Sequence, residues 1–209
     1  MFINELIETT RFYKSFLYSL PLVFLVNTEY ALSLLFFLLF SYIFNDFVDA
    51  EKDKLGHPER PIPSGRLERN FAGKVSVILL LLAMIIPAVQ TSQYLITFLG
   101  ALLLSVLYSA VIKPSYPALA TIFWATAVSL ATVSGLNLGW IFTAGFTFIV
   151  YGYEILLDVR DVDSDSKYYT KPTIAVILNR HSIFVSSTLL LLGVLMLVYS
   201  LYETNLSTI

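Results

Sequence analysis

Charged side chains are distributed very unevenly along the chain, and long stretches carry none. Five runs lack Asp, Glu, Lys, Arg and His, at 15–28, 30–45, 75–112, 114–153 and 182–202. A helix needs about 20 mostly apolar residues to cross the hydrocarbon core of a bilayer. The two middle runs are each long enough for two such helices, and polar breaks fall near their centres, at QTSQ (90–93) and NLG (137–139). The pattern predicts a bundle of about seven transmembrane helices, of which the first two are short.

Composition supports a membrane protein. Of the 209 residues, 57% are hydrophobic and only 13% are charged, whereas a soluble domain has about 25% charged residues. We therefore expect one all-α integral membrane domain over residues 1–209. The chain has no cysteine, which excludes disulfides and thiolate metal sites. Its net charge of −2 gives no reason to expect nucleic acid as a partner.

The positions of the basic residues predict an orientation. With the N-terminus in the cytoplasm and seven helices threaded in order, every Lys and Arg falls on the cytoplasmic side, as the positive-inside rule requires. The sequence thus predicts a multi-pass cell-membrane protein with its N-terminus inside. The 13 basic residues are Arg11, Lys14, Lys52, Lys54, Arg60, Arg66, Arg69, Lys74, Lys113, Arg160, Lys167, Lys171 and Arg180.

Six of the seven aspartates form two copies of one pattern, D-x-x-D-x-x-x-D. Steps of three and four residues place side chains on one face of a helix. Each copy follows an apolar run, so we expect the clusters at the cytoplasmic ends of the second and sixth helices. The first cluster is Asp46, Asp49 and Asp53, and the second is Asp158, Asp161 and Asp165.

Three carboxylates on one face at a helix C-terminus repel one another and oppose the helix dipole. The arrangement therefore favours a bound cation, and clusters of oxygen ligands suit Mg²⁺, which uses one or two carboxylates together with substrate phosphates. Two facing clusters could hold two Mg²⁺ ions with a diphosphate between them. Glu154, one turn before Asp158, is a candidate metal ligand, base or ion-pair partner.

Basic residues after the first cluster are candidates for binding that diphosphate. Arg60, Arg66 and Arg69 flank the stiff, turn-forming segment RPIPSG, and arginine binds phosphate bidentately. Lys113 and Lys167 are further candidates. The alternative is that these side chains only anchor the protein at lipid headgroups.

The motifs resemble the signatures of the UbiA-type intramembrane prenyltransferases. NDFVDAEKD followed by RPIPSGR is similar to their first signature, and EILLDVRDVDSDSK is similar to their second. LYSAVIK, at 107–113, resembles the segment that lies between them. The order, spacing and helix placement agree, and the resemblance covers about residues 11–180.

This family transfers a prenyl group from a prenyl diphosphate to a lipophilic or aromatic acceptor, so the resemblance implies a magnesium-dependent transferase. It implies that Asn45 and the first three aspartates bind Mg²⁺ and diphosphate, and that the second three form another metal site. Arg60, Arg66 and Lys113 would contact phosphate, and Tyr108 would line the cavity beside the allylic carbon. We take Asp49, Asp161 and Tyr108 as the candidate catalytic residues.

The sequence also departs from the family pattern. Leu157 stands where many members have lysine, Ser164 where many have glycine, and the last two helices are missing. Those helices normally close one wall of the prenyl channel. We expect a minimal enzyme, a chain completed by a partner subunit or a second copy, or an enzyme of weakened activity.

The acceptor and the reaction remain open at this point. The motifs look most like the archaeal branch that prenylates geranylgeranylglyceryl phosphate for ether lipids. Aromatic quinone or tetrapyrrole precursors, and a terpene cyclase that needs no acceptor, are alternatives, as is a non-catalytic membrane subunit. A divalent-cation transporter would also carry acids, but it usually binds ions near the bilayer midplane, and the neighbouring arginines would repel a passing cation.

Overall fold

The structure is a computed structural model that describes residues 2–12, 15–16, 28–134 and 139–206, with the side chains at 2, 164–168 and 204–206 outside the description. Its elements are helices throughout this part of the chain. The predicted first helix at 15–28 lies almost wholly outside the described residues, as do the side chains of Asp165 and Lys167. Two compact units make up the chain, Met1–Leu102 and Leu103–Ile209; a single domain over the whole chain stays a prediction.

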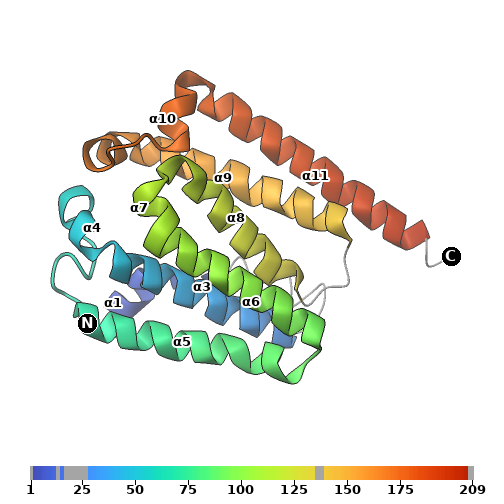
Figure 1. The fold of residues 1–209 in the computed structure, drawn as a ribbon, viewed down its shortest axis with the longest axis horizontal. Helices are drawn as coiled ribbons and strands as arrows, with labels where there is room; N and C mark the ends of the chain where they lie inside the picture. The colour runs from blue at the N-terminus through green and yellow to red at the C-terminus, as the bar shows by residue number, and fades with distance from the viewer. Residues whose placement is uncertain (1, 13–14, 17–27, 135–138, 207–209) are drawn as a thin grey trace. The chain divides into compact units, whose positions relative to one another are not determined.

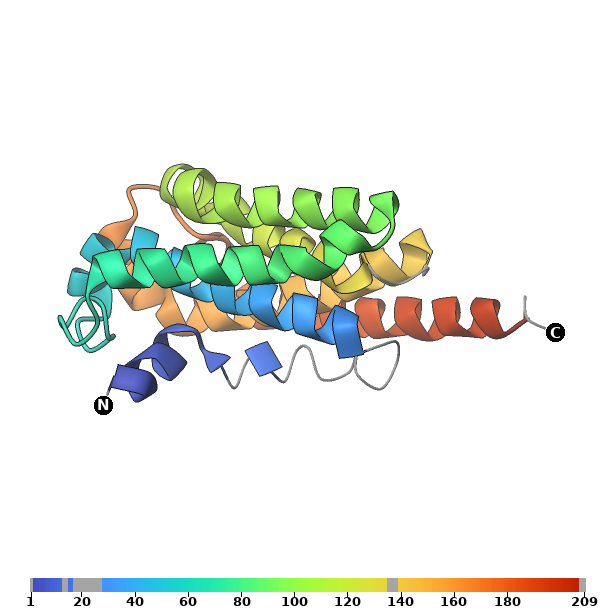
Figure 2. The same cartoon turned by 90° about the horizontal axis from the view of Figure 1, so that it is seen from below.

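The first unit is built around α3 (Thr28–Val48), whose apolar residues come from the run 30–45. Helix α5 (Arg69–Val89) runs alongside it (Figures 1 and 2). The two helices are joined by the Ser33 hydroxyl, which donates to the Ala83 carbonyl at 2.9 Å. Helix α6 (Ser92–Leu107) adds Phe98, whose ring meets that of Phe37 edge-on with centroids 5.7 Å apart. These contacts bury α3 between its neighbours.

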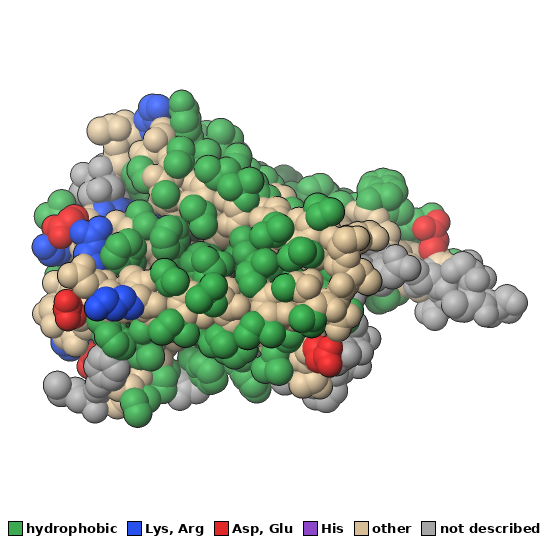
Figure 3. Space-filling model, turned by 60° about the horizontal axis from the view of Figure 1, so that its bottom comes forward, with side chains coloured by type: hydrophobic (Ala, Val, Ile, Leu, Met, Phe, Trp, Pro, Cys, Tyr) green, Lys and Arg blue, Asp and Glu red, His purple; other side chains and the backbone are tan. Residues whose placement is uncertain are grey.

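The end of the first unit that carries α4 (Ala50–Gly56) has its own small core. Ile43, Ala50, Ile62, Leu67 and Ala72 are all buried there and form one cluster. In Figure 3, charged side chains gather at this end of the unit, whereas apolar side chains cover the length of its helices. The short helix α1 (Phe2–Thr9) contacts α3. The loop after α4 is therefore held by apolar residues beneath an acidic and basic surface.

The second unit pairs its two longest helices, α9 (Trp140–Tyr168) and α11 (Ser182–Leu206), side by side (Figure 1). Glycines allow their backbones to approach closely. A Cβ added at Gly193 would lie 2.6 Å from the Gly145 carbonyl oxygen, and the Ser186 hydroxyl donates to the Gly152 carbonyl at 2.6 Å. Small residues at such contacts are typical of helices that associate in a membrane.

The remaining elements of the second unit lie around the start of α8 (Pro117–Val133). Helix α6 passes into a π-helical turn, η1 (Tyr108–Ile112), and then into α7 (Lys113–Ser115). The π turn is closed by the Lys113 N–H, which donates to the Tyr108 carbonyl, and Pro114 follows directly. After α9 come α10 (Ile174–Leu178) and the 3₁₀ turn η2 (Asn179–His181). The π turn places Tyr108 and Lys113 one hydrogen-bonded turn apart.

Five helical stretches are long and apolar enough to cross a bilayer: Thr28–Val48, Arg69–Val89, Ser92–Ser115, Trp140–Asp163 and Ile174–Glu203. Pro117–Val133 is a shorter apolar helix. The predicted break at 90–93 is confirmed, because α5 ends at Val89 and α6 begins at Ser92. The chain is an all-α, multi-pass integral membrane protein, and the total of seven helices stays a prediction.

Candidate functional site

The first acidic cluster lies across the junction between α3 and α4. Asp46 is in the last turn of α3, Asp49 stands between the helices, and Asp53 is on α4. The helical hydrogen bonds continue through the junction: the Asp49 N–H donates to the Asn45 carbonyl and the Asp53 N–H to the Asp49 carbonyl, each at 2.8 Å. The predicted single helix face is thus a junction of two helices that keeps the same turn.

All four polar residues of this cluster are buried, with exposed fractions of 6% for Asn45, 5% for Asp46, 6% for Asp49 and 2% for Asp53. Buried carboxylates are unfavourable unless a cation or hydrogen-bond donors compensate them. The protein therefore has to supply positive charge at this point, or bind it.

Arg60 supplies one such charge from the loop after α4. Its Nη1 lies 2.7 Å from Asp53 Oδ2 and 3.9 Å from Asp46 Oδ1. The loop is folded for this purpose by a series of turns, in which the Ser64 N–H donates to the Arg60 carbonyl and the Leu67 N–H to the Pro61 carbonyl. Gly65 has a φ of +77°, a conformation that glycine adopts without strain. The sequence prediction that this segment directs an arginine toward the acids is met for Arg60.

Arg11 supplies a second charge, and sequence reasoning assigned it no site role. Its Nη2 lies 3.5 Å from Asp46 Oδ1, and its guanidinium stacks over the Tyr42 ring, 4.9 Å from the centroid. Arg11 is 35 residues away from Asp46 in sequence, and it resembles any other basic residue of a cytoplasmic segment. Only the tertiary fold brings it to the cluster.

Arg66 lies elsewhere. It is ion-paired with Glu5 and with Glu8, 3.3 Å away, both on α1, and it donates to the Glu59 carbonyl at 2.5 Å. These contacts tie the N-terminal helix to the loop that carries Arg60. A contact between Arg66 and a diphosphate stays a prediction.

The second acidic cluster lies on one continuous helix, α9, as the spacing predicts. Asp158 Oδ2 accepts a hydrogen bond from the Thr121 hydroxyl of α8 at 2.7 Å. Asp161 is paired with its neighbour Arg160, whose Nε and Nη2 lie 2.8 Å and 3.0 Å from the two carboxylate oxygens. The Asp161 side chain is 25% exposed and that of Arg160 is 67% exposed. This cluster is wetter than the first.

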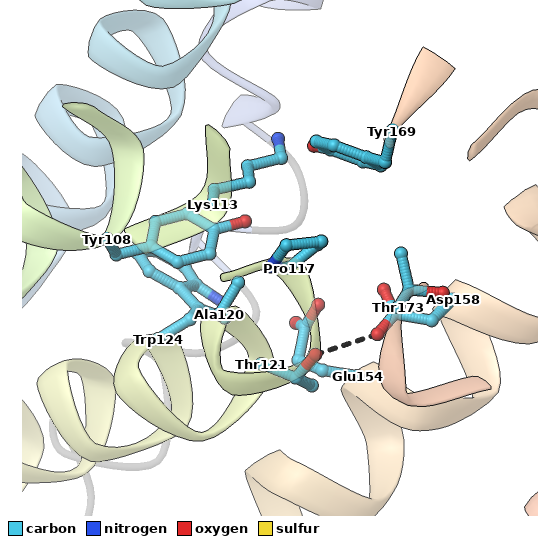
Figure 4. A pocket seen from close by; sticks show the side chains of 10 residues that line it. All are labelled: Tyr108, Lys113, Pro117, Ala120, Thr121, Trp124, Glu154, Asp158, Tyr169 and Thr173. Carbon is cyan, nitrogen blue, oxygen red and sulfur yellow. Dashed lines mark hydrogen bonds between the residues drawn. The ribbon is translucent and has the colours of Figure 1, made fainter. Parts of the chain in front are cut away.

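A pocket of about 40 Å³ adjoins Asp158 within the second unit. Figure 4 shows Lys113 and Tyr169 at one end of it, and Glu154, Asp158, Thr121 and Thr173 gathered at the other. Tyr108 and Trp124 form an aromatic wall, with ring centroids 5.5 Å apart, and the Lys113 ammonium lies 5.7 Å from the Tyr108 ring. The predicted residues Tyr108, Lys113 and Asp158 therefore line one pocket. Its other lining residues are Pro117 and Ala120.

The acidic residues fit a hard divalent ion by their chemistry. Within the described part of the chain, no three carboxylate or histidine side chains gather closely enough to hold a metal by themselves. Mg²⁺ does not need such a cage, since it usually combines one or two carboxylates with phosphate oxygens and waters. The buried oxygen donors at Asp46, Asp49 and Asp53 are of that kind, and arginines balance them here.

Comparison with known proteins identifies relatives of one kind. The family model described as the UbiA prenyltransferase family matches residues 17–209. The digeranylgeranylglyceryl phosphate synthase of Thermococcus sibiricus is 32% identical over 148 residues, which are 67% of this chain and 53% of that protein. The enzyme of the same name from Pyrococcus abyssi is 28% identical over 162 residues, covering 75% and 57%. The chain spans about half the length of these curated relatives.

Among solved structures, a UbiA homologue from Archaeoglobus fulgidus bound to GPP and Mg²⁺ has a TM-score of 0.72 and 19% sequence identity. The match covers 97% of this chain and 86% of that one. At this level of identity the likeness shows a shared fold.

Proposed function

The chain belongs to the UbiA prenyltransferase family, and from this membership we propose that it transfers a prenyl group from a prenyl diphosphate to a lipophilic acceptor with the help of Mg²⁺. The observation that carries the proposal is the first acidic cluster. Three buried aspartates at the end of an apolar helix, balanced by Arg60 and Arg11, form a site of dense opposite charge. Such a site suits a magnesium diphosphate, which carries both kinds of charge.

In the proposed reaction the bond between the allylic carbon and the diphosphate oxygen breaks, and its electron pair leaves with the diphosphate. An oxygen of the acceptor forms the new bond to that carbon, and the hydroxyl proton passes to the released diphosphate. When bound, Mg²⁺ supplies positive charge that stabilises the leaving group. Arg60 and Lys113 add donors for the phosphate oxygens, where the largest electrostatic stabilisation is needed.

The other predicted residues take roles around this step. Asn45, Asp46, Asp49 and Asp53 hold one Mg²⁺, and the second aspartate cluster holds another. The face of the Tyr108 ring stabilises the allylic cation, and the aromatic wall that it forms with Trp124 keeps water away from it. Arg66 and Lys167 are further diphosphate ligands in this proposal, and Arg66 would first have to leave its carboxylate partners on α1.

We place the N-terminus and both acidic clusters on the cytoplasmic side, because this orientation puts all 13 basic residues there. As acceptor we propose geranylgeranylglyceryl phosphate, on the strength of the similarity to the archaeal synthases. A partner subunit or a second copy of the chain would supply the wall that the family's last two helices form.

The test is prenyl transfer by the purified chain in detergent. Geranylgeranyl diphosphate is supplied with and without Mg²⁺, beside geranylgeranylglyceryl phosphate, 4-hydroxybenzoate or a naphthoate. We expect Mg²⁺-dependent transfer to the glyceryl phosphate, and its loss in Asp49→Ala and Asp161→Ala.

The other outcomes are informative in different ways. Transfer only to an aromatic compound would replace the proposed acceptor, and a cyclic hydrocarbon formed without any acceptor would identify a terpene cyclase. Binding of the diphosphate without turnover would indicate a chain that needs a partner or serves as a non-catalytic subunit. Failure to bind the diphosphate at all would refute the proposal.

A further inference from the structure

The pocket beside Asp158 contains a hydroxyl group that the fold leaves unused. Thr173 is 5% exposed, and among the described residues its Oγ1 has no hydrogen-bond partner. It stands immediately before α10 but makes no capping bond with its side chain. A buried hydroxyl without a partner is unfavourable, and this one lines the pocket (Figure 4). The group is placed to bind something that enters the pocket.

The residues around Thr173 define what kind of group that is. Glu154 and Asp158 offer only hydrogen-bond acceptors when ionised, and they repel anions. Thr121 donates its proton to Asp158 Oδ2 and so fixes the orientation of that carboxylate. The Thr173 hydroxyl can donate. A ligand hydroxyl satisfies both sides, because it donates to a carboxylate and accepts from Thr173. Lys113, at the opposite end, disfavours a cationic ligand.

The size of the pocket narrows the choice further. Its volume is about 40 Å³. One water needs about 10–15 Å³ of such space, whereas a cavity that takes benzene measures about 150 Å³. A hydroxyl on an aliphatic carbon therefore fits, and a phenolic or naphtholic ring does not.

We propose that Thr173, together with the carboxylate of Asp158 that Thr121 orients, binds the reacting hydroxyl of an aliphatic alcohol acceptor. The inference rests on the proposed prenyl transfer and adds the acceptor's chemical class and the residues that select it. Three residues carry it, from three elements of the second unit: α8, α9 and the segment before α10. Thr121 acts through Asp158 and is a positioning residue.

The test compares Thr173→Val, which keeps the shape and removes the hydroxyl, with Thr173→Ser, which keeps the hydroxyl. The acceptor is geranylgeranylglyceryl phosphate and the donor is geranylgeranyl diphosphate. Loss of one hydrogen bond to the ligand should raise the KM for the acceptor about five- to tenfold in Thr173→Val. The KM for the diphosphate should stay unchanged, and Thr173→Ser should restore the acceptor KM.

Thr126→Val is the matched control. Thr126 lies on α8, donates to the Ile122 carbonyl at 2.8 Å and does not line the pocket, so both KM values should remain those of the wild type. An unchanged acceptor KM in Thr173→Val would mean that the hydroxyl binds an ordered water only, and would overturn the inference. Equal rises in both KM values would overturn it too, since they indicate general damage to the fold.

Direct binding of radiolabelled geranylgeranylglyceryl phosphate separates this inference from the proposed function. If the wild type transfers nothing but binds the compound, and Thr173→Val weakens that binding, the subsite stands and the proposed reaction fails. If the wild type prenylates 4-hydroxybenzoate and Thr173→Val does not alter its KM, prenyl transfer stands and the alcohol subsite fails. If neither binding nor transfer occurs, both are refuted.

Discussion

The two acidic clusters share one spacing and lie in different surroundings. In the first, the aspartates are buried and receive arginines from remote parts of the chain, Arg11 and Arg60. In the second, Asp161 is partly exposed and is paired with its direct neighbour Arg160, while Asp158 accepts a hydrogen bond from Thr121. The first cluster lies under a folded loop, and the second lies along the side of one helix.

The difference teaches that a repeated motif does not fix the energetics of its carboxylates. Burial makes the charge balance of the first cluster a matter of stability, because an uncompensated buried carboxylate is costly. An exposed ion pair contributes little, since water screens it. We therefore expect the first cluster to govern both folding and chemistry, and the second to govern chemistry with little effect on folding.

The largest expected effect is on catalysis, and it should be shared by the two clusters. Asp49→Asn and Asp161→Asn should each lower the rate of prenyl transfer by about 10²- to 10³-fold, the usual effect of removing one group that stabilises developing charge. Single-turnover transfer of labelled geranylgeranyl diphosphate measures it. Asp163→Asn is the control, because Asp163 is an exposed aspartate on the same helix outside the repeated pattern. A loss confined to Asp49→Asn would show that the two clusters are not equivalent in function.

The next largest effect separates the clusters by stability. Arg60→Ala leaves Asp53 buried without its closest cation, so the free energy of unfolding should fall by about 3 kcal/mol. Thermal unfolding in detergent should also show that Mg²⁺ restores part of the loss, since the ion can replace the missing charge. Lys54→Ala is the control, because its pair with Glu51 is exposed and contributes less than about 1 kcal/mol. Unchanged stability of Arg60→Ala would contradict our account of the first cluster.

A packing change tests the second unit without touching its charges. Gly193→Ala places a Cβ 2.6 Å from the Gly145 carbonyl oxygen and 2.7 Å from Ile149 Cγ1. Unfolding free energy should fall by about 2 kcal/mol, as is usual for overpacked contacts. Gly100→Ala serves as control, since nothing lies within 4 Å of the new Cβ, and alanine in a helix should stabilise by about 0.5–1 kcal/mol. If both variants moved stability in the same direction, close packing of α9 against α11 would not be needed.

The smallest effect is expected at the exposed pair of the second cluster. Arg160→Gln removes the partner of Asp161, and because the Arg160 side chain is 67% exposed, stability should change by less than about 1 kcal/mol. Thermal unfolding beside Arg60→Ala makes the comparison direct. A loss as large as that of Arg60→Ala would mean that the two clusters do not differ in the way their surroundings indicate.

Much of the fold could be predicted from the pattern of charge-free runs. The breaks near 90–93 and 137–139 correspond to the ends of α5 and α8 and the starts of α6 and α9. Predictions of this kind succeed because a bilayer allows only long apolar helices to cross it. The π turn at Tyr108–Ile112 was not foreseen, since no sequence rule used above distinguishes it from an ordinary helical turn.

The candidate site divides in the same way. The repeated spacing alone located both aspartate clusters, and the turn-rich segment RPIPSG indicated Arg60. Arg11, Thr121 and Thr173 carried no signal, because each reaches its site through contacts between segments remote in sequence. Arg66 carried the same signal as Arg60 and is paired with α1 instead.

The sequence by itself determined that this protein crosses a membrane, that its acids fall in two repeated clusters, and that arginines follow the first. These are properties of local order: the length of an apolar run and the period of a helix are written in consecutive residues. Only the tertiary structure decided which aspartates are buried, which cations balance them, and which hydroxyls enter the pocket beside Asp158. Those properties depend on how segments far apart in the chain pack, and packing is set by the complementary shape and charge of surfaces that exist only after folding.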